Sequence, residues 1–395
     1  MSNNVKFCIS SSIITFSLLF TSGGLLQTFF SELGFSLSQI GTYTSVVGVA
    51  QIIMMIVNIF FADRVKNILK LMTFLKLSPI ISCTVFLAFS LFPKTPTGIL
   101  FVTALFICTL QNVFMGFYNV LSYRIPYILF DMRHYATITN SISIISSVAS
   151  IVVSLLITLL SRFFDYKTIM SVAFLLCIIL SVIASDLIRK CKPIETAEPK
   201  SPPSQNNVFS KIFKKDYVFF YCPNFLRGLF MGVVGVISVI FIKNISKNPS
   251  QLSALVPVLS VATILGSILY ERIKKFLSTE MIYFVSSIVI FALFPILVIG
   301  KSITLFFVVY AIIGIAYQMI NQAAAVHPTE FIPYKEIGSF TSVRLIVMTA
   351  GSALSAYIVG LIVESVPSVF ILLAAGLIQF ASGLFYFCFG KKAKK

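Results

Sequence analysis

Long apolar runs constrain this chain more than any other feature. A helix of about 20 apolar residues crosses the ~30 Å hydrocarbon core of a bilayer, and runs of that length follow one another through the sequence. The chain is 58% hydrophobic and 11% charged, with a mean hydropathy of +0.99. We expect spans at residues 7–30, 38–62, 68–92, 99–123, 138–161, 166–188, 217–242, 251–270, 280–300, 302–325, 337–362 and 367–389.

These runs predict an all-α membrane protein with twelve transmembrane helices. No strand-like alternation of polarity is present, and only helices or closed barrels pair their own backbone groups in lipid. The first run has no small-residue cleavage site after it, so we expect it to be retained as a helix. Membrane lipid is therefore an expected partner.

Basic residues are unevenly distributed between the runs. With the N-terminus inside, most Lys and Arg fall in cytoplasmic segments, as the positive-inside rule requires. We therefore expect a multi-pass protein of a bacterial cytoplasmic membrane, with both termini cytoplasmic. The net charge of +17 is then explained by the basic residues that set the membrane topology, and a nucleic-acid partner is not expected.

One polar segment interrupts the succession of apolar runs. Residues 189–216 are rich in proline, lysine and arginine, which is typical of a cytoplasmic linker. We predict an N-terminal six-helix half over residues 1–188, this linker, and a C-terminal half with a basic tail over 217–395.

Two charged stretches indicate an internal repeat. NIFFADRVKN (58–67) and SILYERIKKF (267–276) each follow the second span of a half. A shift of 208 residues lays Asp63 and Arg64 on Glu271 and Arg272.

A second pair of segments supports the same duplication. A shift of 202 residues lays Asn119 on Asn321 and Pro126 on Pro328, where the fourth run of each half ends. The two six-helix halves are therefore expected to be pseudo-symmetric.

At these residues the chain resembles the major facilitator superfamily of secondary transporters, over about residues 7–389. The loop signature of that superfamily is Gly, three residues, Asp-Arg, one residue, Gly. Asp63 and Arg64 match it, whereas Ile59 and Lys66 occupy the glycine positions. The resemblance implies that conformational gating is a role of Asp63, Arg64, Glu271 and Arg272. The alternative is that these charges only set topology.

Three basic residues lie inside apolar runs: Lys76, Arg227 and Arg344. An arginine fork suits carboxylate or phosphate, and Lys76 is close enough to a span end to snorkel. We hypothesise that Arg227, together with Arg344, binds an anionic group of a substrate. The alternative is that each arginine hydrogen-bonds carbonyls and locks helices together.

Polar stripes complete the predicted substrate site. Its further candidates come from the first, fourth and tenth spans: Gln27, Asn112, Asn119, Tyr317, Gln318 and Asn321. Such side chains either hydrogen-bond a solute or hold helices together. His327 and Glu330 have a His-x-x-Glu spacing similar to that of lactose-permease-like symporters, which makes them a weak candidate pair for ion coupling. A solvated loop histidine is the simpler interpretation.

Enzyme and pump chemistry finds no support in the sequence. We found no phosphate-binding GxxxxGK[ST] loop and no nucleophile–base constellation, and the seven cysteines lack metal-ligand spacing. No cofactor or metal is therefore expected. We predict a secondary transporter for a small polar organic solute, with an anionic solute favoured by the two arginines, and with or without a coupling ion. Multidrug or metabolite efflux is the alternative within transport, and a non-transporting sensor or lipid-handling protein is the alternative outside it.

Overall fold

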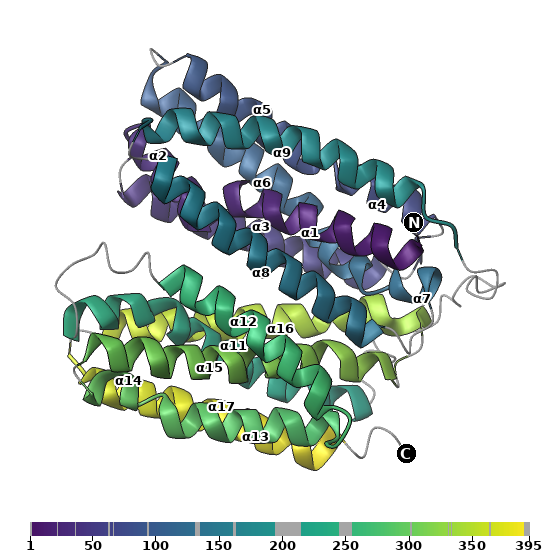
Figure 1. Cartoon of the computed structure of the whole chain (residues 1–395), viewed down its shortest axis with the longest axis vertical. Coiled ribbons are helices and arrows are strands. Elements are labelled where there is room, and N and C mark those ends of the chain that lie inside the picture. Colours follow the sequence, from purple (N-terminus) through teal and green to yellow (C-terminus); the bar gives the residue numbers. More distant parts are fainter. Residues whose placement is uncertain are drawn as a thin grey trace. The chain divides into compact units, whose positions relative to one another are not determined.

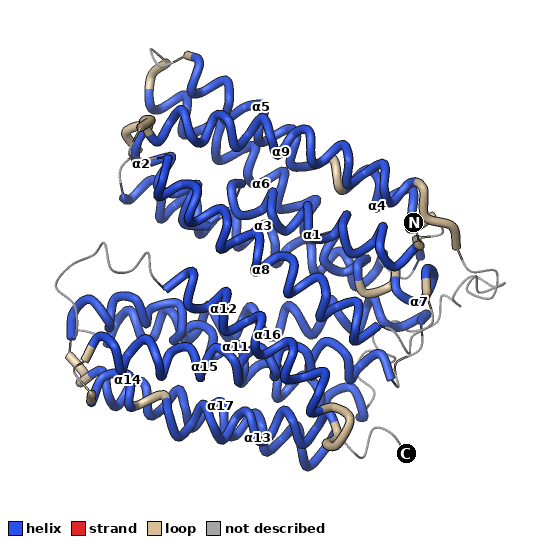
Figure 2. Tube along the Cα trace, viewed as in Figure 1, coloured by secondary structure: helices blue, strands red, loops and turns tan. Residues whose placement is uncertain are grey.

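The protein is described by a computed structural model. It covers residues 2–21, 23–35, 37–61, 64–65, 67–92, 95–130, 135–160, 163–193, 215–244, 255–300, 302–330, 332, 334–362 and 365–390. Within these ranges every regular element is a helix, and short loops join them (Figure 2).

The chain divides into two compact units, Met1–Ser204 and Gln205–Lys395. Unit 1 contains α1 (Asn3–Thr21), α2 (Gly23–Glu32), α3 (Leu37–Phe61), α4 (Ile68–Leu75), α5 (Ser78–Leu91), α6 (Thr97–Ser122), α7 (Pro126–Leu129), α8 (Tyr135–Leu160) and α9 (Tyr166–Arg189). Unit 2 contains α11 (Lys215–Asn244), α12 (Leu255–Ile273), α13 (Thr279–Leu293), α14 (Ile296–Ile299), α15 (Ile303–Val326), the 3-10 helix η4 (His327–Glu330), α16 (Tyr334–Ile362) and α17 (Ser368–Gly390).

Each predicted span coincides with one helix or a consecutive pair of helices, so the twelve-span fold is confirmed. Eight helical segments in the described ranges are long and apolar enough to cross a membrane, and α3 and α13 add shorter apolar stretches. The predicted linker at 189–216 lies mostly outside the described residues, so its limits stay a prediction.

Two predicted spans are not continuous helices in the described residues. The third divides into α4 and α5, and the ninth into α13 and α14. Pro79 follows the first of these breaks and Pro295 lies in the second. Because proline has no N–H, it removes one donor from the helical hydrogen-bond ladder at each place.

The helix contacts bear out the internal repeat. In unit 1, α1 packs on α8 and α9, α3 on α6, and α5 on α6 and α9. In unit 2 the corresponding helices make the same five pairings: α11 packs on α16 and α17, α12 on α15, and α13 on α15 and α17. Figure 1 lets the reader follow these pairs within each unit. The two halves therefore share one internal architecture.

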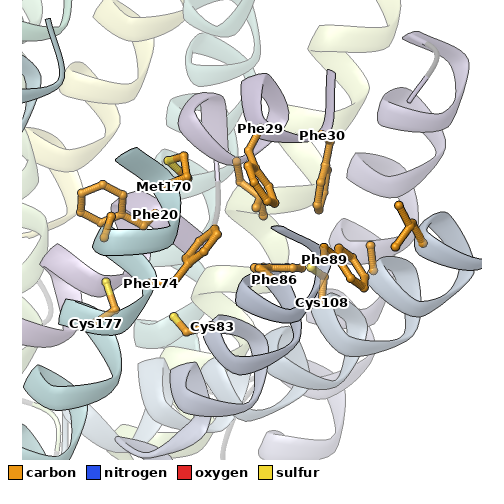
Figure 3. Packing of buried hydrophobic residues seen from close by; sticks show 14 of the residues in the cluster. Phe20, Phe29, Phe30, Cys83, Phe86, Phe89, Cys108, Met170, Phe174 and Cys177 are labelled. Carbon is orange, nitrogen blue, oxygen red and sulfur yellow. The ribbon is translucent and has the colours of Figure 1, made fainter. Parts of the chain in front are cut away.

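Aromatic rings form much of the core of unit 1 (Figure 3). Phe29 and Phe30 of α2 pack against Phe86 of α5 and Phe174 of α9, and all four side chains are fully buried. The Phe29 and Phe174 ring centroids lie 5.2 Å apart in an edge-on arrangement that the ring quadrupoles favour. This cluster fixes α2 against α5 and α9.

Side-chain caps set where several helices begin. Asp165 accepts hydrogen bonds from the N–H (3.1 Å) and the hydroxyl (2.6 Å) of Thr168 at the start of α9. Because these bonds favour the carboxylate, they hold the pKa of Asp165 below its ordinary value. Ser278 and Ser302 cap α13 and α15 in the same manner.

A candidate solute-binding site

Arg227 lies on α11, one turn after Pro223. Its side chain is half-buried, and one terminal guanidinium N–H donates to the Asn321 side-chain oxygen on α15. The guanidinium carbon also lies 5.6 Å from the ring centroid of Tyr317, within the range of a cation–π contact. A cation inside an apolar span is therefore positioned by a neighbouring helix.

An amide relay extends this contact across unit 2. The Asn321 side-chain N–H₂ donates to the Gln318 oxygen at 3.3 Å, and the Gln318 N–H₂ donates to the Ser267 hydroxyl on α12 at 3.0 Å. The relay joins α11, α15 and α12. Its two α15 residues, Gln318 and Asn321, are three positions apart and therefore lie on the same face of the helix. The relay orients the Asn321 oxygen toward Arg227.

Two glycines allow α11 to lie close to α16 beside Arg227. A Cβ at Gly228 would lie 2.1 Å from the carbonyl oxygen of Met348, and a Cβ at Gly351 would lie 2.5 Å from the Phe225 carbonyl oxygen. Both positions therefore admit only glycine without a shift of the backbone. This close approach fixes the position of α11 along α16, and with it the position of the Arg227 backbone.

Arg344 takes a different place from Arg227. It is almost fully buried on α16, and a terminal N–H donates to the carbonyl oxygen of Ala324 in the last turn of α15 at 2.6 Å. This contact is of the helix-locking kind that was the alternative interpretation of Arg344. Binding of a solute by Arg344 stays a prediction.

The remaining predicted site residues belong to unit 1. The Asn112 amide donates to Cys108 of its own helix at 2.9 Å, and the Asn119 carbonyl accepts from Ser122 at 2.7 Å. Gln27 lies in α2, but its side chain is outside the described residues. Neighbouring Gln111, in contrast, donates to the Thr21 hydroxyl at 2.8 Å and joins α6 to α1.

The predicted gating residues lie at helix ends. Asp63 is outside the described residues, and Arg64 is exposed. Glu271 and Arg272 occupy the last turn of α12, half-buried and exposed respectively. Nearby, the Lys274 amine lies 3.7 Å from the Glu330 carboxylate and so links the end of α12 to η4.

His327 is fully buried, so the expectation of a solvated histidine was wrong. Its Nε2 lies 3.1 Å from a carboxylate oxygen of Glu280 at the start of α13, and its Nδ1 lies 3.0 Å from the Tyr386 hydroxyl on α17. From the sequence we paired His327 with Glu330, whereas in the structure the carboxylate beside the His327 Nε2 is that of Glu280. Glu280 was missed because it stands 47 positions from His327 and only tertiary packing joins them.

The His327 pair gives a testable stability prediction. Glu280→Ala should lower the free energy of unfolding by about 2 kcal/mol, because it removes the carboxylate that lies 3.1 Å from the buried imidazole nitrogen. Glu330→Ala, a matched removal of a partly exposed carboxylate, should cost well under half as much. Thermal unfolding of the two purified variants measures the difference, and equal losses would contradict the buried pairing.

Twelve apolar spans in two repeated six-helix units, with a cation and amides inside them, define a multi-pass membrane transporter. The chain belongs to the MFS/sugar transport protein family, whose match covers residues 26–368. This is a family of transporters rather than enzymes. The major facilitator resemblance seen in the sequence is thereby confirmed.

Solved structures show the same fold. A bacterial homologue of the iron transporter ferroportin, in an outward-facing state, superposes with a TM-score of 0.76 at 10% identity, and 100% of each chain is covered. The fucose:proton symporter of E. coli superposes with a TM-score of 0.75 at 12% identity, again over 100% of each chain. No curated protein sequence matches the chain significantly.

Proposed function

We propose that this transporter moves a small polar solute with an anionic group, and that Arg227 binds that group. The observation that carries the proposal is the half-buried guanidinium inside a span, held by Asn321 and Tyr317. A charge in a span is costly and usually functional. The planar fork of an arginine matches the geometry of a carboxylate or phosphate.

The polar neighbours support a solute with several hydroxyl or carbonyl groups. Gln318 and Asn321 offer amides, and the Tyr317 ring supplies an apolar face. The family name and the fucose:proton symporter among similar structures are consistent with a sugar-like body. A sugar acid or sugar phosphate combines such a body with the anionic group that Arg227 selects.

We further propose that transport follows alternating access in the cytoplasmic membrane, with both termini inside. The repeated units support the first part, since duplicated halves underlie this mechanism in secondary transporters. The distribution of Lys and Arg supports the second. Coupling to an ion is left to measurement of uptake with and without an imposed proton or sodium gradient.

A thermal-shift screen with matched solutes tests the proposed substrate class. Purified protein is heated with neutral sugars and with the corresponding sugar acids and phosphates, because a ligand of the folded state raises its apparent stability. We expect the anionic member of at least one pair to raise the unfolding temperature while the neutral member does not. Stabilisation by neutral sugars or lipophilic drugs alone would contradict the proposal.

A further inference from the structure

Lys76 lies at the turn between α4 and α5, inside the third span. Contrary to the expectation that it snorkels, its side chain is completely enclosed by protein, with an exposure of 0%. The amine nitrogen has no hydrogen-bond partner and lies 5.3 Å from the ring centroid of Tyr118 on α6. An ammonium removed from water needs a counter-charge, which an aromatic ring replaces only in part.

The described carboxylates of unit 1 do not supply that counter-charge. Asp165 caps α9 through Thr168, and Glu32 is exposed at the end of α2. Asp186 is bound instead by Arg189 at 2.7 Å and Lys190 at 2.5 Å. Lys76 is therefore a cation whose acid partner is missing from the described part of this unit.

Further donors begin next to Lys76. The α5 helix starts at Ser78, and its N-cap residue, Leu77, makes no side-chain cap. The hydroxyls of Ser78 and Ser82 are both buried without a hydrogen-bond partner. Two hydroxyls and an ammonium favour the same kind of ligand, an anion that accepts hydrogen bonds.

The packing of α9 against α4 and α5 places a third unpartnered hydroxyl, that of Ser181, beside the α4–α5 junction. Ser185 donates to the Thr73 carbonyl oxygen at 2.9 Å, and Cys177 is buried in the same hydrophobic cluster as Cys83 of α5. These contacts fix the register of α9 along α4 and α5. Ser181 lies one turn from each α9 contact, opposite the α4–α5 junction, and its hydroxyl is also buried without a partner.

We propose that Lys76, Ser78 and Ser181 bind a small monovalent anion, of the size of chloride or formate, inside unit 1. The anion supplies the charge that Lys76 lacks and accepts hydrogen bonds from the two hydroxyls. Complete enclosure by protein selects a small ion over an organic solute. The site is independent of the proposed function, since Arg227 belongs to unit 2.

The test uses the full-length protein in detergent and replaces a bulky sulfonate that is not a sugar acid, morpholinoethanesulfonate, by chloride or formate at constant ionic strength. Wild type should show a saturable rise in unfolding temperature with the small anion. Lys76→Met should lose that rise, whereas Lys70→Met, a matched change of an exposed lysine on α4, should retain it. Arg227→Ala should also retain it, which separates this site from the solute site.

Two results would overturn the proposal. One is a wild-type unfolding temperature that is the same in chloride, formate and the bulky sulfonate, and the other is an undiminished rise in Lys76→Met. If Lys76→Met does not fold, Ser78→Ala and Ser181→Ala provide the measurement. Each should weaken the apparent anion affinity by about tenfold, the loss of one hydrogen bond to a charged group, and unchanged affinities would exclude the site.

Discussion

Arg227→Ala should reduce uptake of the anionic solute into proteoliposomes by at least about 100-fold. The change removes the charged hydrogen bonds to the solute, each worth about 1.5–3 kcal/mol, and leaves the amides of Asn321 and Gln318 in place. Arg227→Lys should recover part of the activity, because an ammonium keeps the charge but cannot form the planar fork.

Controls separate this loss from misfolding. Arg189→Ala removes an exposed arginine whose hydrogen bond goes to Asp186 of its own helix, α9, and this variant should transport like the wild type. The thermal stability of each variant is measured on the same preparation. Wild-type uptake by a folded Arg227→Ala protein would show that the arginine only holds α11 to α15.

Gly228→Val should be the most destabilising single change considered for this chain. A Cβ at position 228 would lie 2.1 Å from the Met348 carbonyl oxygen, and the opposing atom is backbone rather than a flexible side chain. The α11 and α16 helices must separate, which loosens a packed interface and costs at least about 4 kcal/mol.

Gly98→Ala is the matched control, because no atom lies within 4 Å of a Cβ at that position on α6. The fraction of folded protein left after heating, measured by size-exclusion chromatography, compares the two variants. The folded fraction of Gly228→Val should disappear at temperatures at which Gly98→Ala remains folded. Similar survival would mean that α11 and α16 are not in the described close contact.

The spans could be predicted because bilayer thickness dictates the length of an apolar run, whatever the helices pack against. The breaks within spans were less visible. Pro79 and Pro295 signal the two described breaks locally, but Pro223 lies inside a continuous α11. A proline thus disfavours a helix, and packing decides whether the helix continues.

Part of the candidate site could also be predicted. Arg227 is conspicuous as a charge in an apolar run, and the helical spacing of Tyr317, Gln318 and Asn321 places them on one face. Ser267 and Glu280 were missed because nothing local in the sequence distinguishes their tertiary partners.

Lys76 shows a further limit of reading charges from sequence. Its distance from the span end allowed snorkelling, but the direction of a long side chain depends on its neighbours. In the fold, the Tyr118 ring and the packing of α9 enclose it. Burial of a charge is therefore a property of tertiary structure, and so is any requirement for a counter-ion.

The central claim is that Arg227 recognises the anionic group of the solute. The most direct measurement is the ratio of affinities for an anionic solute and its neutral analogue, compared between wild type and Arg227→Leu. We predict that wild type prefers the anionic solute by about 100-fold and that Arg227→Leu binds the two almost equally. An undiminished preference in the folded Arg227→Leu protein would contradict the assignment of Arg227 as the anion-binding residue.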